Sequence, residues 1–478
     1  MCEGHRGGGR GEGVGVRRAA TVRVVALCTA AVLAAIPAST TTAARAGEAP
    51  SGPTVVSTEP APRGEILTLW SPALASETKV RVILPDTYAD DTSRAWPVLY
   101  LLHGGGDSWT AWTDATKGDA VELTAGSPFV IVMPDGGAEG WYTDNYGWGE
   151  GGPRWESYHI GELLPLVDSR YRISPGRRAI AGLSMGGHGA LGYAARHPEL
   201  FEAAASFSGV DDLVVLGPLS VWFVAAFELG PHHVTAGMVW GDIMGDQVRF
   251  RARNPADLAV NLGHTALMLR WGDGREVPPD SPDWRKSLAE TFLAAMNESF
   301  ARKAEAAGVA AAVVRRPGTH SWTYWREDLV ASIAWLTAAV ANERPAPDTF
   351  DYVSADPQFS AWGWDVTMTR PVLEFAELHG AGRSGFVARG TGTMHVRTAA
   401  SYCPGLGYVV TATRRGATST RDTRAGADGR LDVDVDLGPP HPFQDWTLGA
   451  LILRNALGDA YLERADVTVT GPALSGCP

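Results

Sequence analysis

The sequence contains few of the residues from which metal centres are built. Only four cysteines occur among 478 residues, and none is spaced with histidines in the manner of a zinc site. We therefore expect neither a metal nor an organic cofactor. Cys2 and Cys28 lie near the N-terminus, whereas Cys403 and Cys477 lie near the C-terminus. In an exported protein, an even pair such as Cys403 and Cys477 is typical of one disulfide bond.

Long apolar runs and an excess of positive charge are also lacking. The apolar run near the N-terminus, Val24 to Ile36, is shorter than the roughly 20 residues that span a bilayer. We therefore expect no stable insertion into a membrane. The formal net charge is -12, which argues against nucleic acid as a partner, because a polyanion is repelled by an acidic surface.

The N-terminus has the features of an export signal. Arginines between positions 17 and 23 precede the apolar run, and Ala44 to Ala46 supply small residues for cleavage before Gly47. Residues 1–46 are therefore predicted to be a signal peptide. The mature protein is expected to be secreted, either into the medium or into association with the cell wall.

Two kinds of pattern divide the rest of the chain. Unbroken apolar segments such as Val98 to Leu102 and Phe129 to Met133 are typical of strands buried on both faces of a parallel sheet. Helical segments such as Tyr158 to Ser169 alternate with them, which predicts an α/β fold with a doubly wound, mostly parallel sheet. Alternating residues from Leu431 to Leu437 predict a small antiparallel sandwich. The expected segments are a signal peptide (1–46), a linker (47–63), an α/β-hydrolase esterase domain (64–342), a second linker (343–349) and a C-terminal β-sandwich (350–478).

A tight turn with a central serine lies between a predicted strand, Arg178 to Ala181, and a predicted helix that begins at Gly187. The turn has the sequence Gly182-Leu183-Ser184-Met185-Gly186. Glycines two residues to either side of the serine let the strand and the helix approach without Cβ clashes, and the strained turn raises the hydroxyl above the sheet. We predict that Ser184 is the nucleophile of an α/β-hydrolase.

The chain order serine, acid, histidine is typical of this fold. His320 follows a strand-like segment, Ala310 to Val314, and precedes a helix, which puts it at the sheet edge where a general base is needed. Two carboxylates compete for the place of the acid. Asp273 follows the apolar segment Ala266 to Leu269 and occupies the usual place, so position alone favours it. Glu290 lies on a predicted helix.

Two longer motifs surround the predicted serine and histidine. They are Gly182 to Leu191 and Gly318 to Trp322. Within a region of about Pro97 to Leu336, they resemble the esterase D family, which includes S-formylglutathione hydrolases, feruloyl-esterase-like enzymes and the antigen-85 mycolyltransferases. In the mycolyltransferases the acid is a helical glutamate, and Glu290 falls at that place. The resemblance therefore implies Glu290 as the acid, with Asp273 as the alternative.

The same resemblance implies an oxyanion hole and a substrate-binding region. Two backbone N–H groups are needed to stabilise the oxyanion. Met185 is expected to supply one of them, and by family analogy Gly105, in the Gly-rich loop after the strand that ends at Leu102, supplies the other. An Asp and an Arg that hold trehalose in the mycolyltransferases correspond here to His103 and Gly106, so the sequence does not favour trehalose as the acceptor. We expect His103 and Trp322 to contact the substrate.

These residues predict a secreted serine esterase or acyltransferase that forms an acyl-enzyme on Ser184 and passes the acyl group to water or to an alcohol. The expected substrate is a small-molecule or lipid ester. One alternative is a mycolyltransferase-like transfer to a sugar or glycerol hydroxyl. An alternative from another class is a catalytically inactive cell-wall or carbohydrate-binding protein, for which Trp362 and Trp364 are the candidate binding residues.

Overall fold

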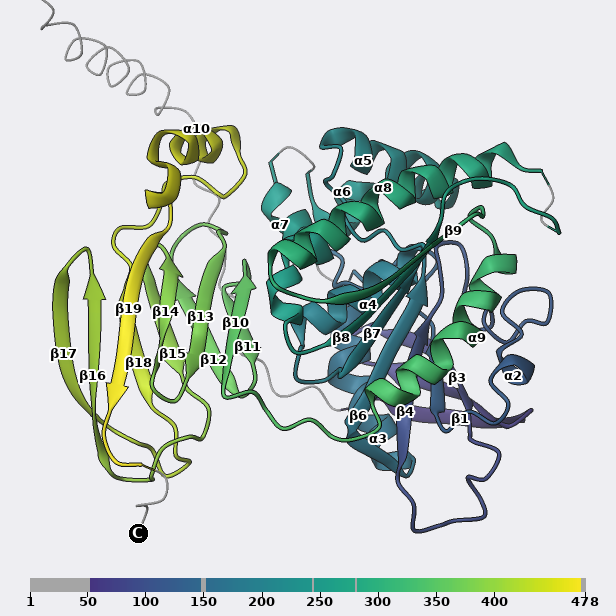
Figure 1. Ribbon diagram of the computed structural model, residues 1–478, viewed down its shortest axis with the longest axis horizontal. Helices are drawn as coiled ribbons and strands as arrows, with labels where there is room; N and C mark the ends of the chain where they lie inside the picture. Colours follow the sequence, from purple (N-terminus) through teal and green to yellow (C-terminus); the bar gives the residue numbers. More distant parts are fainter. Residues whose placement is uncertain (1–51, 148–151, 243–244, 280–281, 474–478) are drawn as a thin grey trace, which may run out of the picture. The chain divides into compact units, whose positions relative to one another are not determined.

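The computed structural model describes residues 52–147, 152–242, 245–279 and 282–473 (Figure 1). The predicted signal peptide, residues 1–46, lies outside these ranges. Residues 51–478 cluster by their contacts into one compact unit. Within this unit, the N-terminal part is built on one mixed sheet and the C-terminal part on two antiparallel sheets.

The N-terminal part contains a nine-stranded sheet with the strand order β1-β2-β3-β5-β4-β6-β7-β8-β9. The six strands β5-β4-β6-β7-β8-β9 each pair in parallel with the next strand in this order. The strands β1, β2 and β3 are antiparallel to their neighbours. The strands are β1 (Thr54–Ala61), β2 (Gly64–Ser71), β3 (Ser76–Ile83), β4 (Trp96–Leu102), β5 (Val130–Pro134), β6 (Ile173–Leu183), β7 (Ala203–Phe207), β8 (Ala266–Gly272) and β9 (Ala311–Arg316).

Both faces of the parallel strands are buried, as their unbroken apolar sequences predict. Val98 and Tyr100 of β4 pack in one core cluster with α3, α4 and α8, whereas Leu99 and Leu101 pack in another with α2 and α9, because successive side chains point to opposite faces of a strand. The helices are α2 (Ala120–Leu123), α3 (Leu164–Arg170), α4 (Met185–Arg196), α5 (Pro218–Val224), α6 (Ala236–Trp240), α7 (Gln247–Arg251), α8 (Trp284–Ala306) and α9 (Trp322–Ala339), and a π-helix, η1 (Ser157–Leu163), precedes α3.

The prediction that residues 47–63 form a linker is wrong for the second half of this segment. Residues Thr54–Ala61 form β1, which pairs antiparallel with β2 at the edge of the sheet. A tight turn joins the two strands, and Arg63 takes a φ of 55° there. Most of the side chains of β1 are exposed. Because an edge strand is held mainly by backbone hydrogen bonds, its polar sequence shows no apolar alternation from which a strand could be predicted.

The C-terminal part consists of two antiparallel sheets, with the strand orders β10-β13-β14-β19-β16-β17 and β11-β12-β15-β18. Their inward-facing residues, among them Trp364, Val396 and Val467, form one core. This confirms the predicted fold class, an α/β part followed by an antiparallel β part. The elements are β10 (Thr349–Ser354), β11 (Gln358–Ala361), β12 (Trp364–Thr369), β13 (Ala376–Gly382), β14 (Gly385–Gly390), β15 (Thr393–Arg397), β16 (Gly407–Arg414), β17 (Ala417–Arg424), β18 (Asp432–Asp436), α10 (Leu448–Leu457) and β19 (Glu463–Thr470).

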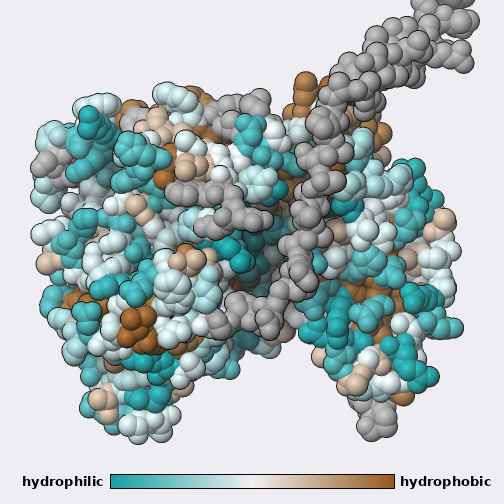
Figure 2. All heavy atoms as spheres, turned by 180° about the vertical axis from the view of Figure 1, so that it is seen from behind, coloured by the Kyte–Doolittle hydropathy of each residue, from teal (hydrophilic) through white to brown (hydrophobic). Residues whose placement is uncertain are grey.

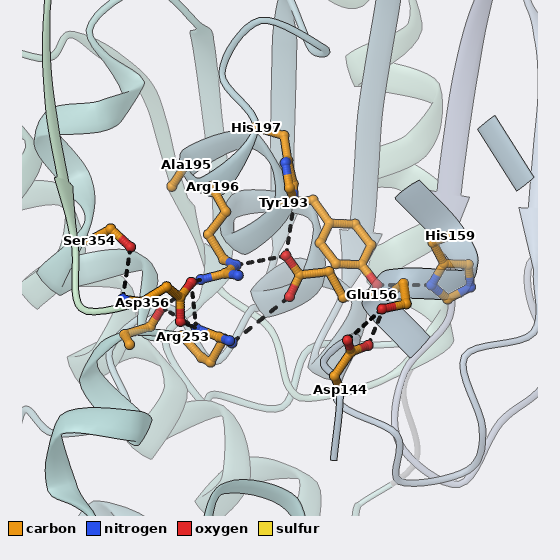
Figure 3. Close-up of polar contacts among 12 residues, drawn as sticks. Asp144, Glu156, His159, Tyr193, Ala195, Arg196, His197, Arg253, Ser354 and Asp356 are labelled. Carbon is orange, nitrogen blue, oxygen red and sulfur yellow. Dashed lines mark hydrogen bonds and ion pairs between the residues drawn. The ribbon is translucent and has the colours of Figure 1, made fainter. Parts of the chain in front are cut away.

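A network of charged side chains joins the C-terminal part to the C-terminal end of α4 (Figure 3). The Asp356 carboxylate accepts hydrogen bonds from Arg196 (2.9 Å) and Arg253 (3.1 Å). Arg196 also donates to Glu156 at 2.8 Å. Burial alone would raise the pKa of the Glu156 carboxyl, but the charges of Arg196 and Arg253 and the hydrogen bond of His197 lower it far below its usual value. The network therefore holds two cations against two ionised carboxylates.

The predicted linker 343–349 is held by polar contacts along its first residues. The Ser174 hydroxyl donates to Glu343 at 2.5 Å, and Arg344 donates to Glu202 and to the His264 carbonyl, both at 3.0 Å. The segment runs into β10 at Thr349. These contacts hold the segment that connects the N-terminal part of the chain to the C-terminal part.

One of the two predicted disulfide cysteines lies in the described part of the chain. Cys403 is buried and disulfide-bonded, whereas Cys477 lies outside the described residues. On the face of the molecule drawn in Figure 2, hydrophilic side chains predominate and hydrophobic ones form small separate groups.

Candidate active site

Ser184 occupies the turn between β6, which ends at Leu183, and α4, which begins at Met185. Its φ of 52° and ψ of -120° form a strained backbone geometry for a residue with a side chain. The turn closes tightly, because a Cβ added at Gly182 would lie 2.2 Å from the Gly186 carbonyl oxygen. Both flanking glycines are therefore required by the close approach of strand and helix.

A chain of short contacts connects Ser184 with a histidine and a glutamate. The His320 ring lies with its Nε2 3.0 Å from the Ser184 Oγ and its Nδ1 2.9 Å from Glu290 Oε2. His320 lies on the loop between β9 and α9, and Glu290 lies on α8. In a neutral imidazole whose Nδ1–H donates to Glu290, Nε2 is the acceptor for the Ser184 hydroxyl. The arrangement is therefore oriented to remove the hydroxyl proton.

The Glu290 carboxylate is fully buried and has donors on both oxygens. Ser208 Oγ and the Gly272 N–H donate to its Oε1 at 2.6 and 2.5 Å, and His320 contacts the other oxygen. Burial alone would raise the pKa of this carboxyl, but the hydrogen bond and charge of His320, together with the Ser208 and Gly272 donors, lower it below its usual value. Glu290 is therefore ionised when it faces the imidazole.

Asp273, which position in the sequence favoured, is placed differently. Its side chain is 38% exposed, and the Arg275 side chain and N–H donate to its two carboxylate oxygens at 2.6 and 3.0 Å. The structure therefore brings Glu290 to His320, whereas Asp273 pairs with an exposed arginine on the loop after β8.

The two backbone N–H groups that the sequence predicted for the oxyanion hole belong to Met185 and Gly105. Met185 is the first residue of α4, so its N–H has no acceptor in a preceding helical turn. In the described part of the chain, the N–H of Gly105 donates to no backbone carbonyl, whereas the next N–H, of Gly106, donates to Ala138 at 2.8 Å. The glycine turn passes close to Ser184, since a Cβ at Gly104 would lie 3.5 Å from the Ser184 Cβ.

His103, which we expected to contact the substrate, is buried beneath this turn. Its side chain is 1% exposed, its Nε2 accepts a hydrogen bond from the Gly136 N–H at 2.9 Å, and its Nδ1 lies 2.8 Å from the Gly104 carbonyl. The Tyr142 hydroxyl donates to the His103 carbonyl at 2.9 Å. Nε2 therefore ties the turn to the loop after β5, while Nδ1 contacts the turn itself. Because both ring nitrogens are engaged and the side chain is buried, the structure does not support the expected substrate contact.

Trp322 is half-buried at the start of α9, next to the loop of His320. Its ring meets those of Trp112 and Trp325 edge to face, at centroid distances of 5.1 and 5.3 Å. Trp325 in turn meets the His320 ring edge to face at 4.7 Å. This aromatic group packs against the His320 ring through Trp325, and Trp322 remains partly exposed.

Sequence reasoning missed the residues that support Glu290 and His320. Ser208 directly follows β7, and Gly272 ends β8, so both lie at the edge of the sheet where parallel strands carry their functional residues. The Lys286 carbonyl accepts a hydrogen bond from the His320 N–H at 3.2 Å. The position of Ser208 after a buried strand was the one signal that could have identified it.

The described residues contain neither a group of metal-ligand side chains nor a membrane-spanning helix. Within residues 52–147, 152–242, 245–279 and 282–473, no three His, Cys, Asp or Glu side chains group in a way that could hold a metal ion. No helix in these ranges has both the length and the apolar composition needed to cross a membrane.

The sheet order, the strained serine turn and the late histidine define an α/β-hydrolase. The chain belongs to the family described as putative esterases, whose model matches residues 71–336. This match and the relatives below confirm the resemblance to esterases and antigen-85 enzymes that the sequence motifs indicated.

Among curated proteins, the esterase Rv1288 of Mycobacterium tuberculosis is 36% identical over 283 residues, which cover 58% of this chain and 57% of that protein. The chain thus matches just over half the length of this relative. The diacylglycerol acyltransferase/mycolyltransferase Ag85A of Mycobacterium leprae is 31% identical over 280 residues, which cover 55% of this chain and 80% of that protein.

Solved structures of similar proteins include a ferulic acid esterase, 25% identical with a TM-score of 0.43, for which the match covers 60% of this chain and all of the other. MPT51 of Mycobacterium tuberculosis is 21% identical with a TM-score of 0.47, and the match covers 56% of this chain and 96% of the other.

Proposed function

We propose that this protein is a secreted serine esterase or acyltransferase that cleaves a carboxylic ester through an acyl-enzyme on Ser184. The observation that carries the proposal is the contact chain from the Ser184 hydroxyl through His320 to the buried carboxylate of Glu290. Membership of the putative esterase family supports the same reaction class. An imidazole held between a hydroxyl and a carboxylate is the arrangement that activates a serine.

In the first half of the reaction, Ser184 Oγ attacks the ester carbonyl carbon while His320 Nε2 takes its proton. The carbonyl π electrons move to the oxygen, and the N–H groups of Gly105 and Met185 donate to this oxyanion. When the C–O bond to the alcohol breaks, the imidazolium returns the proton to the leaving oxygen. Glu290 keeps the imidazole in the required tautomer and stabilises its charged form.

In the second half, an acceptor hydroxyl attacks the acyl-enzyme and His320 again transfers the proton. Water as the acceptor gives hydrolysis. A sugar or glycerol hydroxyl gives transfer, the alternative suggested by relatives named as diacylglycerol acyltransferases and mycolyltransferases. The substrate is a small-molecule or lipid ester, and the partly exposed Trp322 is a proposed contact for it. Product analysis with and without added glycerol separates hydrolysis from transfer.

A fluorophosphonate probe tests the proposed nucleophile. Ser184 Oγ attacks phosphorus and displaces fluoride, which leaves a stable phosphonyl ester on the serine. We expect wild-type protein to be labelled at Ser184 and the Ser184→Ala variant to remain unlabelled. If the folded wild-type protein is not labelled and hydrolyses no ester, the inactive binding protein becomes the better account.

Export is part of the proposal and has its own test. The basic segment, the apolar run and the small residues before Gly47 support cleavage of a signal peptide. N-terminal sequencing of protein recovered from the culture medium or cell-wall fraction is expected to begin near Gly47. Retention of the first 46 residues in cell-associated protein would contradict secretion.

A further inference from the structure

A cleft of about 500 Å³ lies between the C-terminal end of α4 and the hairpin formed by β11 and β12. Its volume lies in the range of ligand sites, roughly 300–1,000 Å³. The α4 side contributes Arg196 and Glu199, and the hairpin side contributes outward-facing residues of both strands. Ser184 lies at the opposite end of the 12-residue helix α4, about 18 Å away along its axis. The cleft is therefore separate from the candidate active site.

The positive charges next to the cleft, those of Arg196 and Arg253, are already paired with carboxylates. Arg196 contacts both Glu156 and Asp356, and Arg253 contacts the same two carboxylates (Figure 3). Each guanidinium therefore already faces two anions. A phosphate, a sulfate or another anionic ligand would have to compete with these carboxylates, so the cleft does not favour an anion.

The hairpin wall presents short polar side chains in cross-strand pairs. Gln358 lies opposite Thr367, and Ser360 lies opposite Asp365. All four are exposed and share one face of the hairpin, because residues two apart along a strand point to the same side. The Ser360 hydroxyl donates to Asp365 at 2.7 Å, whereas the amide of Gln358 and the hydroxyl of Thr367 can both donate and accept hydrogen bonds.

The opposite wall offers an acceptor. The Glu199 side chain is exposed in the cleft, and desolvation raises the pKa of its carboxyl. The N–H of Trp362 donates to this carboxyl at 3.5 Å. The rings of Tyr352 and Phe359 stack 5.5 Å apart in the lining, but both are buried. The Glu199 carboxylate can therefore accept hydrogen bonds from the hydroxyls of a ligand.

We propose that this cleft binds a segment of a neutral polysaccharide. A pyranose ring has hydroxyls that donate and accept at its edges. These hydroxyls match the Glu199 carboxylate, the Gln358 amide and the Thr367 hydroxyl. Binding here would hold the enzyme on a glycan while the active site at the other end of α4 stays open. This inference goes beyond the proposed esterase function and does not depend on it.

The test measures binding of neutral hexasaccharides (xylohexaose, cellohexaose and chitohexaose) to the full mature chain by calorimetry. The Ser184→Ala variant is used, so that the result is independent of turnover. We expect one site for at least one of the three sugars. Glu199→Gln and, separately, Gln358→Ala are expected to weaken binding about tenfold, as for the loss of a hydrogen bond to a charged group or of a well-placed neutral one.

Thr420→Ala is the matched control, because Thr420 is an exposed strand residue on β17, outside the cleft. It is expected to bind like the parent, and thermal melting verifies that each variant is folded. The proposal is overturned if none of the three sugars binds, or if Glu199→Gln and Gln358→Ala bind as tightly as the parent. Displacement of the sugar by spermidine at equal concentration would also overturn it, because the cleft would then be a cation site.

Discussion

Glu290 and His320 meet through a 2.9 Å contact between Oε2 and Nδ1, although they come from different layers of the fold. Glu290 is on α8, which packs on one face of the sheet, and His320 is on the loop before α9, which packs on the other. The contact therefore passes across the carboxyl edge of the sheet, where the turn after β6 holds Ser184.

The pairing predicts a large effect from a small change at Glu290. In Glu290→Gln, the amide no longer holds the imidazole in the tautomer that accepts the serine proton, and kcat is expected to fall about a thousandfold. Asp273→Asn is the matched control, because its carboxylate pairs with Arg275 and is expected to leave kcat near the wild-type value. Steady-state kinetics on a chromogenic ester give both values. A Glu290→Gln variant that stays active beside an inactive Asp273→Asn variant would reverse the assignment.

Local sequence was sufficient to anticipate that Ser184 and His320 lie together, but not which carboxylate meets His320. The serine turn and the histidine loop are determined by residues adjacent in the chain, so short motifs predict them. The position of Glu290 depends instead on Ser208 and Gly272, which come from two other segments. Spacing alone pointed to Asp273 for this reason, and the resemblance to a family was needed to favour Glu290.

The positions of His103 and β1 likewise depend on other segments of the chain, so their own local sequence did not predict them. The motif identified the glycine turn correctly as a close neighbour of Ser184, but the direction of the His103 ring depends on the Gly136 N–H, which lies in another loop. The strand β1 has mostly exposed residues, half of them polar, and is held by β2, so its sequence resembles that of a linker. The buried strands of the parallel sheet were predictable because both of their faces are apolar.

His103 is predicted to position the glycine turn that contains Gly105 without binding substrate. His103→Ala removes the acceptor of the Gly136 N–H and is expected to loosen the turn, so that kcat falls at least tenfold while KM changes little. His103→Gln, which retains an acceptor, is expected to recover part of kcat. Michaelis–Menten analysis of both variants on one ester decides the question. A rise in KM with unchanged kcat would instead show a direct substrate contact.

Two neighbouring buried aspartates are predicted to affect stability in opposite directions with pH. Burial, with a contribution from the Asp212 charge, raises the pKa of Asp211 to about 7 despite the Ser206 hydrogen bond. The unfolded chain ionises this carboxyl near pH 4, so folding carries a cost that grows as pH rises from about 4 to 7. Asp211→Asn is expected to unfold with a higher free energy than wild type at pH 8, and the difference is expected to shrink towards pH 4.5.

For Asp212, burial is outweighed by the charge of Lys303 and by the donors Asn254 and Ser299, which lower the pKa. Its stabilising contribution is therefore present above the unfolded pKa and is lost as pH falls through the folded value. Asp212→Asn is expected to be less stable than wild type at pH 8. Urea unfolding of both variants at pH 4.5, 6 and 8 checks the pair. Equal destabilisation by Asp211→Asn at every pH would contradict the shift.

Two glycines of α4 are predicted to respond oppositely to alanine. A Cβ at Gly186 would lie 2.6 Å from the carbonyl oxygens of Leu102 and His103, which are backbone atoms that do not move aside. Gly186→Ala is therefore expected to lose most activity and several °C of melting temperature. At Gly192 the nearest atom would be 3.9 Å away, so Gly192→Ala is expected to add about 1 kcal/mol of stability with activity unchanged. Thermal melting and esterase assays compare them, and a stable, active Gly186→Ala would contradict the tight turn.

The most direct test of the central claim is to trap the acyl-enzyme. Wild-type protein is mixed with a chromogenic ester, quenched in acid during the first turnover and analysed by peptide mass spectrometry. The account predicts one acyl group on the peptide that contains Ser184, in an amount equal to the burst of released alcohol, and no adduct or burst in Ser184→Ala. Turnover by Ser184→Ala at the wild-type rate, or an acyl group on any other residue that accounts for the burst, would contradict it.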